Sequence, residues 1–173
     1  MKYRLPTFED KEILSKYVKE HFDNGETSIS ASFGLSKTDF KEWVETISNN
    51  ATIGNKNLGE NLLYLCFDNN ELIGLLSIRY DLSQEFRDKY GDIGYGVRPT
   101  KRNKGYATKM LEYGLSVCKQ KGMKEVLIGC YKDNIASATV IKNNNGILIS
   151  ENDNYKKGKI SQYYLIKIQN AYY

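Results

Sequence analysis

The segment from residue 92 to residue 108 reads Asp92-Ile-Gly-Tyr-Gly-Val-Arg-Pro-Thr-Lys-Arg-Asn-Lys-Gly-Tyr-Ala-Thr108. Its first part predicts a strand over residues 92–97. Pro99 ends that strand because proline has no N–H to donate to a ladder. A short basic loop follows, and the pattern then predicts a helix over about 105–121. The segment is therefore a strand–loop–helix unit, and the other predicted elements are arranged around it.

The spacing Arg102-x-x-Gly105-x-Ala107 places a loop directly before the first turn of that helix. The N–H groups of a first turn have no helical partner, and the helix dipole adds partial positive charge there. Gly105 lets a ligand approach the backbone closely, and Ala107 keeps the next approach open. Positive charge around the loop comes from Arg98, Lys101, Arg102 and Lys104. Together these features predict a site for a pyrophosphate, although the hexapeptide alone also fits an ordinary basic helix start.

Two common phosphate-binding motifs are excluded. The sequence has no Gly-x-x-x-x-Gly-Lys-Ser/Thr, and no Gly-x-Gly-x-x-Gly in the required place. The chain also does not begin with a βαβ unit. Neither a P-loop nor a Rossmann dinucleotide site is therefore expected.

The whole pattern predicts the order β-α-α-β-β-β-α-β-α-β-β and a single domain over residues 1–173. The predicted strands are 2–5, 62–67, 72–80, 92–97, 124–130, 146–150 and 159–168, and the later helices are 105–121 and 133–144. A right-handed crossover makes strands 92–97 and 124–130 parallel, and hairpins make the outer strands antiparallel. The expected fold class is α/β, with a central mixed sheet flanked by about four helices.

The first two helices are predicted from caps and apolar stripes. Thr7 and Asp10 resemble a capping box before the first helix. Ser36 is expected to cap the second helix, whose core stripe is Phe40, Trp43, Val44 and Ile47. Segments 23–35, 50–61 and 81–91 are expected to be connections, and 151–158 a polar turn.

Composition limits the function. The 173 residues carry 25 Lys and Arg against 21 Asp and Glu, a net charge of +4 spread along the chain, so a solvated surface is favoured over a nucleic-acid patch. Cys66, Cys118 and Cys130 are far apart and indicate neither a disulfide framework nor a zinc site. No signal peptide or membrane span is expected, and a cytoplasmic location fits best. His21, the one histidine, lies on an apolar helix face and is expected to be packed rather than catalytic.

Two stretches resemble a known family. Residues 97–108 resemble the acyl-coenzyme A signature of the GNAT N-acetyltransferases, and 132–137 (Lys-Asp-Asn-Ile-Ala-Ser) resemble that superfamily's second conserved patch. The resemblance extends to the element order over nearly the whole chain. It implies a GNAT fold in which strands 92–97 and 124–130 splay apart around the pantetheine arm. It also implies acetyl-CoA as co-substrate and no metal.

The resemblance assigns roles to particular residues. The backbone N–H of Val97 would polarise the thioester carbonyl, and Asn134 would bond the pantetheine arm. The pyrophosphate would be held by the loop and helix start, namely Arg102, Asn103, Lys104, Gly105, Tyr106, Ala107 and Thr108. Asp92 comes nearest to the family's general base, with a plain turn-ending role as the alternative. Ile141 stands where the family has a tyrosine as general acid, which leaves Tyr131 and Tyr163 as substitutes, or a thiolate that leaves without a dedicated acid.

The predicted function is transfer of an acetyl group from acetyl-CoA to a primary amine of a small molecule or peptide, by direct attack in a ternary complex. The alternative is a catalytically weak acyl-CoA-binding or regulatory module, motivated by Ile141. A nucleic-acid-binding protein ranks third. The acceptor would lie among residues 23–35, 50–61 and 151–158, where Glu26 and Glu60 could attract an ammonium group. The sequence leaves the oligomeric state open, with a homodimer as one option.

Overall fold

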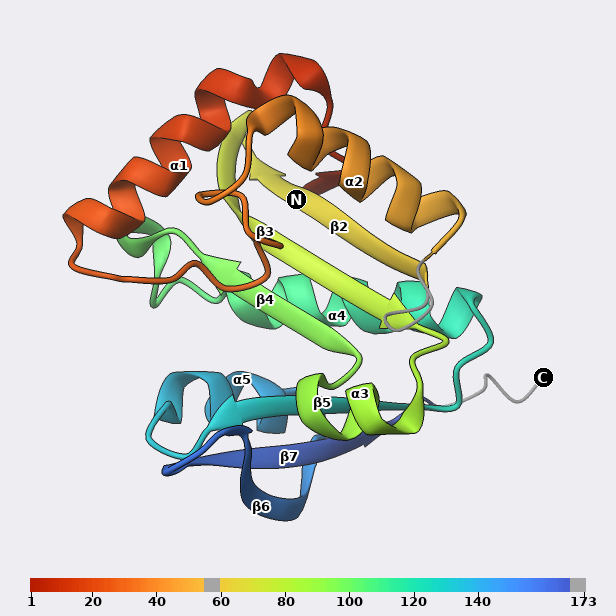
Figure 1. The fold of residues 1–173 in the computed structure, drawn as a ribbon. Helices are drawn as coiled ribbons and strands as arrows, with labels where there is room; N and C mark the ends of the chain where they lie inside the picture. The colour runs from red at the N-terminus through yellow and green to blue at the C-terminus, as the bar shows by residue number, and fades with distance from the viewer. Residues whose placement is uncertain (55–59, 169–173) are drawn as a thin grey trace.

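The computed structural model describes residues 1–54 and 60–168. Figure 1 shows two sheets that separate from one another at the neighbouring strands β4 and β5, with helices on both faces of the first sheet. In chain order the elements are β1 (Lys2–Arg4), η1 (Phe8–Asp10), α1 (Lys11–Asp23), α2 (Phe40–Thr52), β2 (Glu60–Asp68), β3 (Glu71–Tyr80), α3 (Gln84–Tyr90), β4 (Ile93–Val97), η2 (Pro99–Lys101), α4 (Tyr106–Gln120), β5 (Glu125–Tyr131), α5 (Ile135–Asn143), β6 (Ile147–Lys156) and β7 (Lys159–Lys167). The predicted order is confirmed, with α3 added.

The first sheet has the strand order β1-β2-β3-β4, and every neighbouring pair is antiparallel. Helices α1 and α2 cover one face and α4 covers the other (Figure 1). The β2 and β3 residues alternate in direction, so one set of leucines packs on α1 and α2 while the other packs on α4. Leu14 and Tyr17 of α1 and Trp43 of α2 are completely or almost completely buried there. The predicted core stripe of α2 is confirmed at Trp43, Val44 and Ile47.

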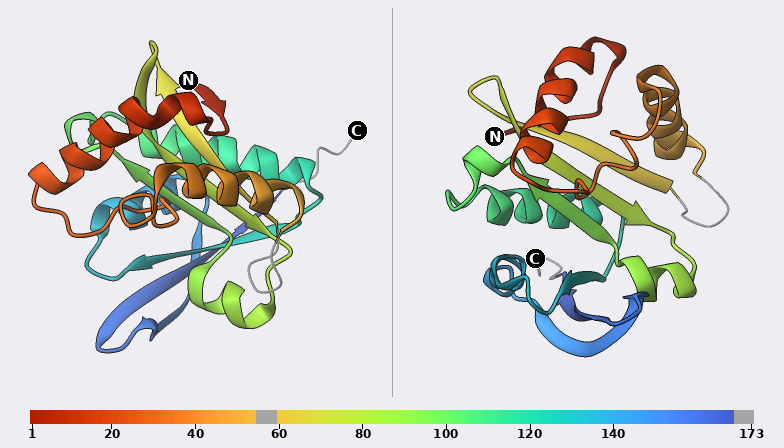
Figure 2. Two further views of the ribbon diagram at one scale, coloured as in Figure 1. Left: turned by 45° about the horizontal axis from the view of Figure 1, so that its top comes forward. Right: turned by 60° about the vertical axis from the view of Figure 1, so that its left-hand side comes forward.

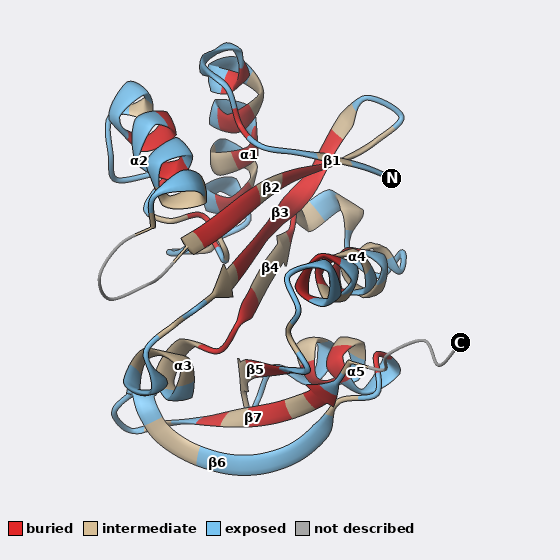
Figure 3. Ribbon diagram, turned by 90° about the vertical axis from the view of Figure 1, so that its right-hand side faces the viewer, coloured by how far each residue is buried: buried red, intermediate tan, exposed pale blue. Residues whose placement is uncertain are grey.

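The second sheet has the order β5-β7-β6 and is also antiparallel. The expected mixed sheet is therefore divided in two, because β4 and β5 do not pair in a ladder. Figure 3 shows the two sheets meeting near α3 and opening away from it. One backbone bond joins them at the closed end, from the Asp92 N–H to the Leu127 carbonyl at 2.6 Å. The predicted splaying of strands 92–97 and 124–130 is confirmed.

Three local predictions need correction. Residues 84–90 form α3 rather than a plain connection. Asp39, not Ser36, caps α2, because its carboxylate accepts the N–H groups of Lys41 and Glu42 at 3.0 and 3.2 Å. The expected turn at 151–158 is mostly strand, since β6 continues to Lys156 through two register shifts. The capping box of Thr7 and Asp10 is confirmed.

The connection between α1 and α2 crosses the outer face of β4 (Figure 2). Gly96 makes this close approach possible, because a Cβ there would lie 3.1 Å from the Ser30 side chain and carbonyl. The segment from Ser30 to Ala31 is thereby held against the middle of β4. Among the described helices, none is long and apolar enough to cross a membrane.

Candidate active site

The edge of β4 that faces β5 carries backbone groups with no strand partner. Arg79 N–H donates to the Asp92 carbonyl at 2.7 Å and Arg98 N–H donates to the Ile73 carbonyl at 2.9 Å. Because antiparallel hydrogen bonding alternates along a strand, Tyr95 and Val97 turn their N–H groups away from β3 and toward the gap. An extended ligand in the gap would find these groups available. This is the geometry that the predicted role of the Val97 N–H requires.

The N-terminus of α4 lies at the open end of the gap. Gly105 is its N-cap, with φ of 77° and open space where a Cβ would be. The first helical bond runs from the Lys109 N–H to the Gly105 carbonyl at 3.3 Å. The N–H groups of Tyr106, Ala107 and Thr108 thus have no helical partner, and no side chain caps them. The structure thus brings the predicted phosphate-binding backbone together at a helix start, a geometry that favours an anion.

Most of the basic side chains in the β4–α4 loop, which are predicted to surround a pyrophosphate, are instead paired with glutamates. Figure 1 shows the loop between β4 and α4 close to the end of α1, and three of its cations form ion pairs. These pairs are Arg98 with Glu20, Lys101 with Glu71, and Arg102 with Glu26. Arg102 Nε also donates to the Val97 carbonyl at 3.0 Å.

Lys104 is the loop cation that forms no ion pair within residues 1–54 and 60–168. Asn103 has a left-handed φ of 59°, which turns the loop toward the helix. The Tyr106 hydroxyl donates to Asp68 at 2.7 Å and fixes the helix start to the β2–β3 turn. The free positive charge of the site therefore comes from Lys104 and the backbone N–H groups, while the arginines hold the loop in place.

Asn134 is the N-cap of α5 and lies across the gap from β4. Its Oδ1 accepts the Ser137 N–H at 3.1 Å. Its Nδ2 makes no hydrogen bond to any described residue, so it can donate to a ligand in the gap. The predicted role of Asn134 is compatible with this arrangement and stays a prediction.

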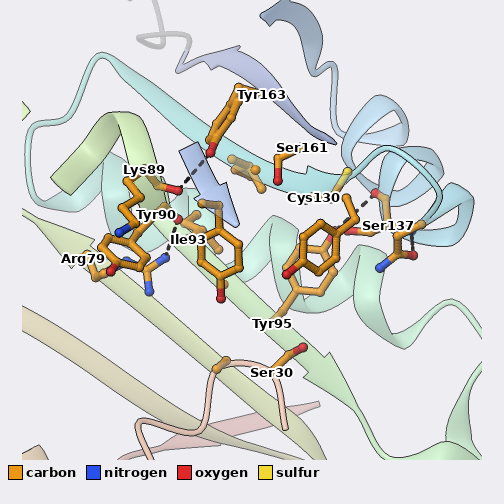
Figure 4. Close-up of a pocket in the computed structure, with 17 residues that line it drawn as sticks. Ser30, Arg79, Lys89, Tyr90, Ile93, Tyr95, Cys130, Ser137, Ser161 and Tyr163 are labelled. Carbon is orange, nitrogen blue, oxygen red and sulfur yellow. Dashed lines mark hydrogen bonds between the residues drawn. The ribbon is translucent and has the colours of Figure 1, made fainter. Parts of the chain in front are cut away.

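A cavity of about 250 Å³ lies in the gap and extends from α3 at the closed end to the start of α5, and Figure 4 shows the side chains around it. The residues that line the cavity come from β3 and β4 of the first sheet, from β5, β6 and β7 of the second sheet, and from α3, α5 and the α1–α2 connection. Aromatic rings dominate the wall, namely Tyr90, Tyr95, Tyr131, Tyr155 and Tyr163. Arg79 and Lys89 are its two cations, and no Asp or Glu lines it. The wall is therefore aromatic and positively charged.

Two hydroxyl groups meet inside the gap. The Tyr95 and Ser137 hydroxyls are 2.9 Å apart and share a hydrogen bond. Burial raises the pKa of Tyr95 to about 12, so its phenol remains protonated at neutral pH. Ile141, at the position of the family's tyrosine, is fully buried in the core. Ser137 lies four residues, about one helical turn, before Ile141 on α5. This spacing places Ser137 on the same side of the helix as the family's tyrosine, and it is the feature of the sequence from which Ser137 could have been predicted.

The two substitute tyrosines also line the cavity. Tyr163 is almost completely buried, and its hydroxyl donates to the Lys89 carbonyl at 3.0 Å. Tyr131 packs edge-on against Tyr155 and lies under Lys159 Nζ.

Asp92 lies at the closed end of the gap and is 2% exposed. Its carboxylate accepts hydrogen bonds from Arg87 Nε at 3.0 Å and from the Leu127 N–H at 2.7 Å. Burial raises the pKa of this carboxyl, against the opposing effect of Leu127 and Arg87. Oδ2 thus links β4 to β5 and to α3, while Oδ1 accepts, among the described residues, only from Arg87 Nε at 3.2 Å, and Asp92 does not line the cavity. Its role as a base stays a prediction.

The predicted acceptor-side residues are only partly brought together. Ser30 and Ala31 from the first loop and Tyr155 from the 151–158 segment line the cavity. Glu26 bonds to Arg102 and His21, and Glu60 bonds to the Tyr80 hydroxyl, so neither reaches it. Residues 55–59 of the predicted 50–61 connection lie outside the described residues. His21 is buried against Tyr17, as expected.

A split pair of parallel strands, an edge strand with free N–H groups and a helix start at the mouth define an acyl-coenzyme A-dependent transferase fold. The chain belongs to the GNAT family, because the model described as "Acetyltransferase (GNAT) domain" matches residues 4–146. It is thus an acetyl-CoA-dependent N-acetyltransferase by class, with acetyl-CoA as co-substrate. No cluster of metal-ligating side chains occurs in the part of the chain that the structure describes.

Solved structures support the fold. An acetyltransferase from Salmonella typhimurium that modifies the N-terminal serine of ribosomal protein L7/L12 is 20% identical, with a TM-score of 0.70 over 96% of this chain and 94% of that chain. The microcin C7 self-immunity acetyltransferase MccE, solved with acetyl-CoA and AMP, is 15% identical, with a TM-score of 0.73 over 96% and 91%. The putative acetyltransferase yncA from Salmonella typhimurium, solved with acetyl-CoA, is 12% identical, with a TM-score of 0.68 over 99% and 96%. Among curated protein sequences, none matches.

Proposed function

We propose that this protein transfers an acetyl group from acetyl-CoA to a primary amine of a small molecule or peptide, by direct attack in a ternary complex. The observation that carries the proposal is the unpaired edge of β4, with the Val97 N–H facing the gap and the α4 N-terminus at its mouth. The whole sequence, residues 1–173, is proposed to form this one domain. The free thiols of Cys66, Cys118 and Cys130 favour a reducing compartment such as the cytoplasm.

The residues present fit the co-substrate. The N–H groups of Tyr106, Ala107 and Thr108, with Lys104, suit the pyrophosphate. The Asn134 amide and the free N–H groups of β4 suit the amide-rich pantetheine arm. When bound, acetyl-CoA supplies the activated acetyl thioester. Arg102 acts through its bonds to Val97 and Glu26, which keep the loop in the shape that presents these donors.

The chain's own groups can assist each stage of the transfer. The Val97 N–H stabilises negative charge on the reacting carbonyl oxygen. The Tyr95 and Ser137 hydroxyls provide a proton for the departing thiolate, a role for which the raised pKa of Tyr95 keeps its phenol protonated. The attacking nitrogen loses one N–H proton as the amide forms, and this proton returns to the hydroxyl pair, so that the products are the amide and the neutral thiol. The cations of the cavity disfavour an ammonium ion, so the acceptor binds as the reactive neutral amine. Asp92 then needs no direct contact with the amine.

A peptide or protein N-terminus is one acceptor to consider, because the Salmonella relative modifies an N-terminal serine. A catalytically weak module is the second candidate, favoured by the buried Ile141. The pair of Tyr95 and Ser137 supports the enzyme over this module, because it offers two hydroxyls in the gap where the thioester is proposed to lie.

The first experiment measures coenzyme A binding by calorimetry in the wild type and in Gly105→Trp. The indole would cover the N–H groups at the start of α4, so we expect affinity to fall at least 30-fold. Gly122→Trp is the matched control, since Gly122 has a φ of 78° and open space at the other end of α4. Equal affinity in all three proteins would refute the phosphate site.

The second experiment measures thiol release from acetyl-CoA with amino acids, peptides, polyamines and aminoglycosides as acceptors. We expect turnover with at least one class of acceptor. A protein that binds acetyl-CoA tightly but turns over none of them would be the catalytically weak module instead.

A further inference from the structure

We propose that the acceptor carries an anionic group, a carboxylate or a phosphate, and that Arg79 and Lys89 bind this group in the closed half of the cavity. This assignment rests on the acetyl transfer proposed above and names the class of its acceptor. Figure 4 shows both side chains on the same side of the cavity, next to Tyr90.

Arg79 is a cation without a carboxylate partner among the described residues. From β3 it donates through Nε to the Gly91 carbonyl and through Nη2 to the Tyr90 carbonyl, both at 3.0 Å. Its Nη1 is 3.4 Å from the Ser77 hydroxyl, so donor capacity remains. Removing a guanidinium from water without a counterion is costly. An anion brought by the ligand would recover that cost.

The acidic groups of this corner are already occupied. Asp92 accepts from Arg87, and Arg87 also pairs with Glu125 at 3.7 Å. Lys89 forms no ion pair with any described residue, and its Nζ lies 5.3 Å from the centre of the Tyr90 ring. The two cations at the cavity are thus ones that form no ion pair with an acidic side chain of residues 1–54 and 60–168, although the Asp92 charge also favours the charged form of Arg79.

The remaining wall agrees with an anionic ligand. The tyrosines offer hydroxyl donors and apolar ring surface, and no Asp or Glu lines the cavity to repel an anion. A polyamine, by contrast, would place further positive charge beside Arg79 and Lys89. We therefore expect polycationic acceptors to be poor ones.

The distance along β4 from Arg79 to the Val97 N–H is also compatible with one acceptor molecule that contacts both. A Cβ on Gly94 would lie 3.7 Å from Arg79 Nη2, so the guanidinium stands beside the backbone of Gly94. Gly94 and Val97 are three residues apart, which is about 10 Å along a strand. One small molecule or chain end can therefore place its amine at the thioester while its anionic group contacts Arg79.

The test compares acceptors that differ only in the anionic group. The pairs are tyrosine with tyrosinamide, the dipeptide Gly-Asp with Gly-Asn, and phosphoethanolamine with ethanolamine. We expect kcat/KM to be at least 10-fold higher for the charged member of at least one pair. The first two pairs report on a carboxylate and the third on a phosphate. Equal values within all three pairs would overturn the proposal.

Substitutions of Arg79 and Lys89 test whether these two side chains cause the preference for the anionic acceptor. Lys89→Gln should reduce the preference for the charged member about 3-fold or more, and Arg79→Lys should reduce it while retaining the charge needed for folding. The KM for acetyl-CoA should not change. Lys121→Gln is the matched control, because Lys121 Nζ lies 4.7 Å from the Tyr80 ring, outside the cavity. An unaltered preference in Lys89→Gln and Arg79→Lys would overturn the assignment of these residues.

A binding measurement separates this proposal from the acetyl transfer itself. N-acetyltyrosine and N-acetyltyrosinamide are titrated by calorimetry into the complex of the protein with coenzyme A. Tighter binding of the carboxylate, weakened in Lys89→Gln, supports the anion site even if no acceptor is turned over. Equal affinities, or no binding by either, count against the site. If the wild-type protein did not bind coenzyme A at all, the proposed acetyl transfer itself would be refuted instead.

Discussion

At the scale of single residues, the contact between Tyr95 and Ser137 joins β4 of the first sheet to α5 beside the second. The two hydroxyls are 2.9 Å apart, and 42 positions separate them in the sequence. Ser137 also sits one turn before the buried Ile141, on the side of α5 that lines the cavity. This contact is why we propose the hydroxyl pair as the proton donor for the thiolate, in place of the tyrosine that the family resemblance leads one to expect.

We predict that Ser137→Ala lowers kcat for acetyl transfer about 10- to 100-fold, because general acid assistance is typically worth about that much or more. The KM for acetyl-CoA should change less than about 3-fold, since Ser137 does not contribute to the phosphate site. Steady-state kinetics of thiol release measure both constants. Thr139→Ala serves as control, because that exposed hydroxyl bonds only to the Ile135 carbonyl of the same helix. A full kcat in Ser137→Ala would remove the hydroxyl pair from the mechanism.

Residues of the site differ in how well the sequence predicts them. Gly105 and Asn134 are predictable because their roles depend on local backbone geometry, a left-handed N-cap and a helix N-cap. Tyr95 and Arg79 are not, because their roles depend on which groups the fold brings opposite them. The pairing of Arg102 with Glu26 likewise follows from the return of the α1–α2 connection toward the loop, which a linear pattern does not encode.

At the scale of elements, two glutamates tie the α1 region to the β4–α4 loop. Glu20 accepts hydrogen bonds from Arg98 and from both the N–H and hydroxyl of Thr100. Burial alone would raise the pKa of Glu20, but these bonds outweigh it and lower the pKa to about 2. Burial is likewise outweighed at Glu26 by Arg102 and His21, which lower its pKa to about 2. The loop that presents the phosphate donors is thus held by ionised carboxylates.

We predict that the interactions of Glu20 with Arg98 and Thr100 no longer stabilise the protein at acidic pH. A carboxyl whose pKa is lowered by folding stabilises the fold above its unfolded pKa, and the stabilisation is lost as the pH falls toward the folded pKa. The window here runs from about pH 5 down to about pH 2. Glu20→Gln should lower stability at pH 7 by about 2 kcal/mol, and the difference from wild type should disappear near pH 2.

Thermal midpoints of the two proteins between pH 2 and pH 7 measure this effect. Glu12→Gln is the control, because Glu12 pairs with Lys16 on the exposed face of α1 and should have little influence. A difference between Glu20→Gln and wild type that stayed constant down to pH 2 would contradict the role of the ionised carboxylate.

Most elements follow from their apolar periodicity, and the exceptions have a physical cause. Residues 84–90 carry charges on most sides and no buried residue, so α3 lacks the stripe that identifies a helix. It is stabilised by packing beside β5 and by Arg87, not by an apolar face of its own. The cap of α2 was misplaced because Ser36 and Asp39 are both good caps, and only the course of the preceding loop decides between them.

At the scale of the whole molecule, Asp92 joins two sheets that otherwise separate. Its N–H and carboxylate bind the backbone of Leu127 on β5, its carbonyl binds the Arg79 N–H on β3, and its carboxylate also binds Arg87 on α3. These bonds hold β4 and β5 together near α3, so the two strands can separate toward their other ends. The angle between the sheets, and hence the width available to acetyl-CoA, depends on this residue.

We predict that Asp92→Asn destabilises the protein by about 3 kcal/mol, because it deprives the half-buried Arg87 of its closest carboxylate partner and leaves it only Glu125. For a chain of this length that corresponds to a fall in the thermal midpoint of roughly 6–12 °C. The KM for acetyl-CoA should rise, since the closed end is loosened. Asp88→Asn on the exposed side of α3 is the control and should leave both quantities unchanged. If the midpoint instead stays within about 2 °C while kcat falls more than about 100-fold, Asp92 acts as the general base.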